Sequence, residues 1–406
     1  MMNLRQQPLF VLSVAAAALG YFVDLYDIVI FGVVRVSSLT ELGLTGQDNT
    51  DWGVALLNLQ MIGMLLGGFF WGVVGDRMGR RFALLATITL YSLANLANAF
   101  VVNVEQYAVL RFLAGVGLAG ELGAGVTLVS ELLPRHLRGY GTTVIAVLGL
   151  LGALTASYVG AELHWRMAYL AGGVMGFLVL GMRWIVLRES AMFEEQKSQA
   201  LRQGDLRLLF GRWPTLLKFA AVTAIGVPIW YISALFVNLA PEYGRALGFA
   251  EPLTVAAVLR YQALGLAIGS GASGLLSEWM QSRKKILYLC FSLLLALVLA
   301  LMNSGSVESY CLLMFAIGLA QGYWTAFIIM AAEQFGTNIR ATVSTSVPNI
   351  VRAMTVPVTL SVLALWPLLG LVPATLLVGA VVFGLAYLAL YRLRETYGKD
   401  LNYTER

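Results

Sequence analysis

Long runs of apolar residues, separated by short polar segments, follow one another along the whole chain. Each run is about 20 residues long, the length that a helix needs to cross the hydrocarbon core of a bilayer. The runs are continuous rather than alternating, and in lipid each backbone group must find its partner within its own segment, so helices are predicted. The predicted spans cover residues 9–34, 52–75, 82–102, 107–133, 139–162 and 165–187, and then 215–239, 253–276, 286–302, 309–332, 342–365 and 373–391.

A short motif occurs twice in the chain. Gly72-Val-Val-Gly-Asp-Arg-Met-Gly-Arg-Arg81 recurs, with several replacements, 202 residues later at Gly274-Leu-Leu-Ser-Glu-Trp-Met-Gln-Ser-Arg283. The same offset relates Gln60 to Gln262, Gly120 to Gly322 and Glu131 to Glu333. A fixed offset of half the chain indicates a duplicated unit. We therefore predict an all-α membrane protein with two six-helix bundles, residues 1–187 and 215–406, joined by a polar linker at 188–214; such repeats are a transporter architecture.

Composition and charge support a membrane protein and orient it. Hydrophobic residues make up 59% of the chain and charged residues 12%, about half the charged share of a soluble domain. Most of the 27 Lys and Arg residues fall at the termini or in loops after even-numbered spans, which the positive-inside tendency places in the cytoplasm with both termini. The net charge of +5 therefore reports topology and indicates no nucleic-acid partner. The first run is too long for the apolar core of a signal peptide, so we predict an uncleaved span.

The sequence offers little to an enzyme, a cofactor or a metal. Cys290 and Cys311 fall in or beside membrane spans without metal-ligand spacing, so neither a disulfide nor a metal site is indicated. His136 and His164 lie in loops on opposite sides of the predicted membrane, and no loop is long enough for a catalytic domain. The chain has no P-loop pattern, which argues against transport driven by ATP.

The motif at residues 72–81 matches without a gap the signature Gly-x-x-x-Asp-Arg-x-Gly-Arg-Arg, and in these residues the chain resembles the major facilitator superfamily. Three further patterns are similar to the branch of sugar porters, phosphate symporters and metabolite:proton symporters: Arg111-Phe-Leu-x-Gly115-x-Gly117, Glu131-x-x-Pro134-x-x-x-Arg138-Gly139 and Arg188-Glu-Ser190. The resemblance covers the whole chain, more faintly in the second half. It implies twelve transmembrane helices in two bundles that rock about a central site.

The resemblance also implies a gate, in which charged residues at the cytoplasmic helix ends form ion pairs between the two halves. The residues carried over are Gly72, Asp76, Arg80, Arg81, Glu131, Arg138 and Glu189 in the first half, and Glu278, Arg283, Glu333 and Arg340 in the second. The alternative is that these charges only follow the positive-inside rule. Acidic residues contribute little to orientation, which favours the gate for the carboxylates.

Three acidic residues fall at membrane depth, where a charged side chain needs a partner, a water-filled cavity or a function. Asp24 and Asp27 are three residues apart, hence on one face of the first helix, and Glu121 lies midway along the fourth. A carboxyl group in a low-dielectric site is disfavoured as an anion, so these residues are candidates for proton uptake. Asp24-Leu-Tyr-Asp27 also resembles a motif linked to proton movement in phosphate:proton symporters. The alternative for Asp27 is a static ion pair with Arg111.

The second half carries deep cations without a deep acid. A guanidinium group stays protonated and fits a carboxylate or a phosphate, so Arg260 and Arg352 are candidates for binding an anion. The predicted substrate-binding set is Arg111, Trp230, Arg260, Gln262, Gln321, Tyr323, Trp324, Asn349 and Arg352. The alternatives are packing roles for Arg111, Tyr323 and Trp324 and an interhelical hydrogen bond for Gln262. Arg183, near the inner end of the sixth span, is predicted to snorkel to the interface.

The combined prediction is a proton-coupled symporter of a small anionic metabolite, acting as a monomer in a bacterial inner membrane. A proton-coupled efflux antiporter is the nearest rival, although the glycine-proline signature of such antiporters is missing from the fifth span, where Gly149-Leu-Leu-Gly152 continues without proline. A symporter of a neutral sugar or amino acid is a further alternative. A channel is disfavoured by the asymmetric charges of the two halves, and a non-transporting sensor on the same fold stays open.

Overall fold

The computed structural model describes residues 7–121, 138–186 and 211–398. Some side chains within these ranges lie outside the description, among them those of Asp76, Arg77, Arg80, Arg138 and Arg340. The described part is almost entirely helical and contains no strand. The chain divides into two compact units, Met1–Gln203 and Gly204–Arg406, and the division falls inside the predicted linker.

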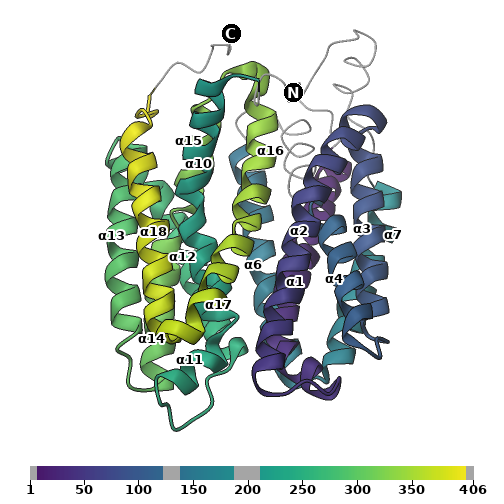
Figure 1. Cartoon of the computed structure of the whole chain (residues 1–406). Coiled ribbons are helices and arrows are strands. Elements are labelled where there is room, and N and C mark those ends of the chain that lie inside the picture. Colours follow the sequence, from purple (N-terminus) through teal and green to yellow (C-terminus); the bar gives the residue numbers. More distant parts are fainter. Residues whose placement is uncertain (1–6, 122–137, 187–210, 399–406) are drawn as a thin grey trace. The chain divides into compact units, whose positions relative to one another are not determined.

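The first unit contains six described helices (Figure 1). They are α1 (Gln7–Glu41), α2 (Gly46–Met78), α3 (Arg80–Asn98), α4 (Val104–Leu118), α6 (Arg138–Glu162) and α7 (Trp165–Val186). The chain turns from α2 to α3 at Gly79, whose φ of 99° is a backbone conformation that suits glycine.

The second unit has the same order of long helices but more interruptions. Its elements are α10 (Trp213–Ile232), the π-helical segment η1 (Ser233–Val237), α11 (Ala240–Ala246), α12 (Val255–Trp279), α13 (Arg283–Leu301), α14 (Val307–Gln321), α15 (Trp324–Glu333), α16 (Thr337–Ala353), α17 (Thr355–Leu369) and α18 (Leu371–Arg392). Two spans are each formed by consecutive helices, because α14 continues into α15 and α16 into α17.

Nine segments of the described chain are long and apolar enough to cross a membrane, which agrees with an integral membrane protein. They include all six spans predicted in the second half. The predicted spans 82–102, 107–133 and 139–162 are not among the nine. For the second of these, the described part of the helix ends near residue 121.

A close helix crossing is repeated in the two units. In the first unit, a Cβ atom at Gly63 or Gly67 of α2 would collide with the backbone of Phe112 or Val116 in α4. In the second unit, Gly265 and Gly269 of α12 face the backbone of Phe315 and Leu319 in α14 in the same way. The glycines keep the offset of 202, but their partners are 203 residues apart. The duplication is therefore visible in the packing, with the fourth helix shifted by one residue relative to the predicted match of Gly120 with Gly322.

The first and last helices of each unit are also joined in the same way. The Tyr26 hydroxyl on α1 donates to the Ala168 carbonyl on α7 over 2.8 Å. The Tyr231 hydroxyl on α10 donates to the Thr375 carbonyl on α18 over 2.9 Å. Each bond holds the first span of its unit against the last one. The first helices of the two units are therefore anchored in equivalent ways.

Candidate functional site

Two acidic residues and an arginine lie in the interior of the first unit. Asp24 and Asp27 on α1 and Arg111 on α4 are all fully buried. Arg111 donates through Nη2 to Oε1 of Gln60 on α2, and its guanidinium carbon lies 4.9 Å from the centre of the Phe31 ring. A cation over an aromatic ring is stabilised by the negative face of the ring, so the position of Arg111 is set mainly by an amide and a phenyl group.

Asp27 lies beside Arg111 but does not form an ion pair with it. Within the described chain, neither carboxylate oxygen of Asp27 has a hydrogen-bond donor in range, and no salt bridge up to 4.0 Å joins it to Arg111. Arg111 and Asp24 are charged groups that act on it electrostatically. Asp27 also faces the backbone of Gly172 on α7, where a Cβ atom would lie 2.8 Å from its Oδ1. The geometry therefore does not support the alternative of a static Asp27–Arg111 pair.

Glu121 forms a two-pronged ion pair with Arg183 of α7. Arg183 Nη2 lies 2.8 Å from Glu121 Oε2, and Nη1 lies 2.8 Å from Oε1. Thr87 donates to the same carboxylate over 2.9 Å. Glu121 is 2% and Arg183 0% exposed, so this is a buried, charge-assisted pair.

The prediction that Arg183 snorkels to the interface is wrong. Its guanidinium group turns inward, because Gly20 of α1 leaves room for it and the Ala16 carbonyl accepts from Nε over 3.2 Å. Glu121 supplies the opposite charge. The sequence could not reveal this partner, because Glu121 and Arg183 are 62 positions apart in the chain.

In the second unit, three predicted substrate-binding residues support the backbone of α10. Pro228 lies inside α10, and the π-helical segment η1 follows it. The Tyr323 hydroxyl donates to the Ile225 carbonyl over 3.0 Å, and the Gln321 amide donates to the Ile229 carbonyl over 3.0 Å. Gln262 donates to Gln321 over 2.7 Å. These contacts fit the alternative roles in packing and in interhelical hydrogen bonding.

Arg352 of α16 is buried with few partners. Its guanidinium carbon lies 5.8 Å from the ring centre of Trp230 on α10, and Nη1 lies 3.5 Å from Oδ1 of Asn349. Within the described chain, Nε has no hydrogen-bond acceptor and Arg352 belongs to no ion pair. Thr355, one turn further on, also has a hydroxyl without a partner in that part of the chain. Buried polar groups are normally satisfied, so this cluster has unused capacity to bind a polar ligand.

The other two predicted substrate-binding residues, Arg260 and Trp324, are less deeply buried. Arg260 on α12 is half-buried. Trp324, at the start of α15, is also half-buried and packs on Phe327 with the two ring centres 5.2 Å apart. This ring contact fits the alternative packing role for Trp324.

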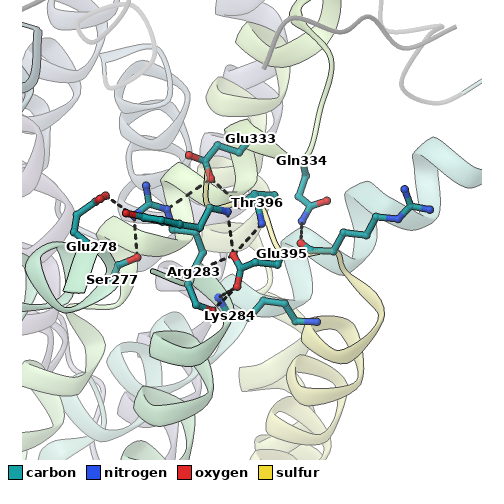
Figure 2. A network of polar contacts seen from close by, with 11 residues as sticks. Ser277, Glu278, Arg283, Lys284, Glu333, Gln334, Glu395 and Thr396 are labelled. Atoms are coloured by element: carbon teal, nitrogen blue, oxygen red, sulfur yellow. Dashed lines mark hydrogen bonds and ion pairs between the residues drawn. The ribbon is translucent and has the colours of Figure 1, made fainter. Parts of the chain in front are cut away.

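A charge cluster joins the turn between α12 and α13 to the end of the second unit, as Figure 2 shows. Arg283 donates from Nη1 to Ser277 over 2.8 Å and to Glu278 over 2.9 Å, and its Nε lies 3.7 Å from Oε2 of Glu333. We call these four residues, with Glu395 and Thr396, the α12–α13 charge cluster. Three of the predicted gate residues, Glu278, Arg283 and Glu333, are therefore in contact within one unit.

Glu395 is a member of this cluster that the sequence analysis missed. Its Oε1 accepts from the backbone N–H of Arg283 over 3.0 Å, and its Oε2 accepts from that of Lys284 over 3.1 Å and from the Ser282 hydroxyl. Burial alone would raise the pKa of this carboxyl, but the bonds from Ser282 and from the backbone N–H groups outweigh it and lower the pKa. A carboxylate at a helix N-terminus is stabilised by the helix dipole. The sequence signal for this role is the acidic residue between Arg394 and Thr396. It lies in the C-terminal tail, whose cations alone were used to predict the topology.

The remaining predicted gate residues are only partly described. Arg81 donates to the Trp184 carbonyl on α7 over 3.2 Å, and Gly72 lies exposed on α2. Glu131 and Glu189 lie outside the described residues, as do the side chains of Asp76, Arg80, Arg138 and Arg340.

Comparison with known proteins gives one family model and several transporters. The model of the Major Facilitator Superfamily matches residues 17–354. The 3-(3-hydroxy-phenyl)propionate transporter of Escherichia coli is 30% identical over 292 residues, covering 70% of each protein. A niacin transporter of Acinetobacter baylyi is 34% identical over 165 residues, and a gallate transporter of Pseudomonas putida 30% over 202 residues. The last two matches span less than half of the relative, 37% and 44% of its length.

A solved structure shares the fold. A D-xylose-proton symporter superimposes with a TM-score of 0.73 and covers 97% of this chain at 17% sequence identity. At that identity the likeness concerns the fold alone. The relatives named here are all transporters rather than enzymes.

Proposed function

This chain belongs to the Major Facilitator Superfamily, and on that premise we propose that it is a proton-coupled symporter of a small aromatic carboxylate. The protein moves its substrate by alternating access, with the two units as the moving parts. This narrows the anionic metabolite expected from the sequence to one chemical class.

The buried guanidinium group of Arg352 carries this proposal. A cation held in a membrane protein with one long hydrogen bond and no ion pair in the described chain is costly unless it meets an anion. A carboxylate can accept two parallel N–H groups from such a fork. Asn349, whose side chain contacts the same guanidinium, would hold it in position for that contact.

Trp230 supports an aromatic substrate rather than an aliphatic one. Its ring lies 5.8 Å from the guanidinium carbon of Arg352, so a bound carboxylate would place the rest of the ligand near an indole ring. Aromatic rings add stacking or edge-to-face energy to their buried area. The relatives named for 3-(3-hydroxy-phenyl)propionate, niacin and gallate transport carry aromatic acids, which agrees with this chemistry.

Asp24 and Asp27 supply the proton coupling. Both are fully buried on one face of α1, and Asp27 lies near a cation without being neutralised by an ion pair in the described chain. Such a carboxyl can exist in both protonation states as its surroundings change between the two states of the transport cycle. Glu121 is a weaker coupling candidate, because Arg183 already neutralises it.

The proposal extends to location and assembly. The protein acts as a monomer in a bacterial inner membrane, with both termini in the cytoplasm. The α12–α13 charge cluster would then lie on the cytoplasmic side, and its residues would belong to the gate that closes there.

Binding to the Arg352→Gln variant tests the proposal. Hydrogen bonds to a charged group contribute about 1.5–3 kcal/mol, so the affinity for gallate or nicotinate should fall by roughly 10- to 100-fold, measured by calorimetry on the purified chain. The matched control is Arg212→Gln, which removes an exposed cation and should leave the affinity unchanged. Nicotinamide, which lacks the carboxylate, should bind weakly to both.

An unchanged affinity of Arg352→Gln for the acids would refute the anion site. Binding of D-xylose or of an amino acid, with no binding of aromatic acids, would favour the alternative of a symporter for a neutral substrate. Uptake of the acid into inverted vesicles, in exchange for protons that leave the lumen, would favour the efflux antiporter.

A further inference from the structure

The surface where α13 begins and α18 ends combines free positive charges with exposed aromatic and apolar side chains. The two helices lie side by side in the second unit (Figure 1). We propose that this surface binds the headgroup of an anionic phospholipid, with the acyl chains lying along α13 and α18. The proposal is independent of the transported substrate.

Four cations surround this end of the unit. Lys284 is held in place, because its Nζ donates to the Leu393 carbonyl over 2.8 Å and to the Tyr391 carbonyl over 3.3 Å. These bonds bring the start of α13 against the residues that follow α18. Lys285, Arg392 and Arg394 are exposed, and within the described chain none of their charged groups has an ion pair or a side-chain hydrogen bond.

The acids nearby bond to groups other than the charged ends of these four cations. Both oxygens of Glu395 accept hydrogen bonds from Ser282 and from the backbone at the start of α13 (Figure 2). Glu278 and Glu333 are paired with Arg283. With Arg283, five cations stand beside three carboxylates, so a net positive charge remains here for an external anion.

Aromatic and polar groups continue the surface into the membrane. Tyr391 is 77% exposed, and the stacked rings of Tyr288 and Tyr387 have their centres 5.9 Å apart. The Tyr387 hydroxyl lies 2.8 Å from the Ser292 hydroxyl, two turns of α13 below Lys285. Tyrosines are common at the level of lipid headgroups, because their rings are apolar and their hydroxyls are polar.

Exposed leucines below the tyrosines favour a lipid over a free anion. Leu289 and Leu293 on α13 are 44% and 45% exposed, and Leu385 and Leu388 on α18 are also exposed. They present an apolar surface to acyl chains directly beneath the cations. Basic pockets between transmembrane helices are a known form of headgroup site, and the positive-inside tendency alone would require neither the anchored Lys284 nor the tyrosines.

Lipid titration of the full chain, followed by native mass spectrometry in detergent, tests this site. The probes are phosphatidylglycerol and, as a neutral headgroup, phosphatidylcholine. A Lys or Arg near the membrane surface contributes about fivefold to binding of anionic lipid. The triple variant Lys285→Gln, Arg392→Gln, Arg394→Gln should therefore bind phosphatidylglycerol roughly a hundredfold more weakly and phosphatidylcholine unchanged.

Two controls separate this site from general electrostatics. Arg212→Gln removes an exposed cation at the start of α10 and should change the affinity for phosphatidylglycerol less than twofold. Tyr391→Ala keeps every charge and should still weaken binding severalfold, since it removes the exposed ring. Circular dichroism melts confirm that each variant is folded.

Three results would overturn the proposal. The first is a triple variant that binds phosphatidylglycerol as tightly as the parent protein. The second is a loss in Arg212→Gln as large as a single substitution within the site produces. The third is displacement of the lipid by an equal concentration of inorganic phosphate, which would identify a general anion site instead.

Discussion

The buried pair of Glu121 and Arg183 gives the sharpest test of how this fold is stabilised. Glu121→Gln leaves the Arg183 guanidinium group charged and fully buried without its counter-charge, facing only neutral acceptors in the described chain: the new amide oxygen and the Ala16 and Leu84 carbonyls at 3.2 and 3.3 Å. Arg183→Met leaves the carboxylate with Thr87 as its remaining donor. Each single change therefore strands one charge in a site that excludes water.

The expected cost follows from this geometry. Breaking a buried ion pair by removing one partner costs about 3–5 kcal/mol, whereas removing both partners together is often nearly neutral. The double variant Glu121→Gln, Arg183→Met should thus be more stable than either single variant. The two single costs should therefore add up to far more than the cost of the double variant, and the coupling energy should reach or exceed about 3 kcal/mol, the upper end for residues in direct contact.

Reversible unfolding in mixed micelles, followed by far-ultraviolet circular dichroism, measures these free energies. The control is Glu162→Gln, the same chemical change at an exposed position of the same unit, which should cost less than about 0.5 kcal/mol. If Glu121→Gln cost no more than this control, the pair would not stabilise the fold. A stable double variant that had lost uphill uptake would instead show that Glu121 takes part in proton coupling.

Three further predictions address other parts of the protein. Asp27→Asn should abolish substrate accumulation driven by a pH gradient but leave substrate exchange intact, and undiminished uphill uptake would exclude Asp27 from coupling. The pKa of Glu395 is lowered in the folded protein, so the ionised carboxylate stabilises the fold fully above the ordinary glutamate pKa of about 4.3, and this contribution is lost as the pH falls through the lower folded pKa. Glu395→Gln should therefore flatten the acid side of a plot of unfolding free energy against pH, and an unchanged plot would contradict this. Gly269→Ala should destabilise the protein by about 1–3 kcal/mol, because the new Cβ meets the Leu319 backbone, while Gly271→Ala, where the space is open, should be nearly neutral in the same unfolding assay.

The general architecture could be predicted because the solvent imposes it. A bilayer requires apolar segments of a set length with internal hydrogen bonds, and these are visible as runs of about 20 residues. The repeated motif at residues 72 and 274 predicted two similar units, and the structure repeats the helix crossing at Gly63 and Gly265. The one-residue shift of the fourth helix was not predictable, because it depends on which backbone carbonyl each glycine meets.

The roles of the polar residues within each unit needed the tertiary structure. Their presence at membrane depth indicated that each must have a partner or a function, and it made Asp24, Asp27 and Arg352 candidates for proton coupling and anion binding. Only the packing shows that Arg183 turns toward Glu121, that Gln321 and Tyr323 satisfy carbonyls of α10, and that Glu395 caps α13. Composition and period determine which segments enter the membrane, since hydrophobicity is a local property of the chain. The partner of a buried charge is a residue far away in sequence, so only the folded bundle decides which charges are neutralised and which are left to bind a ligand.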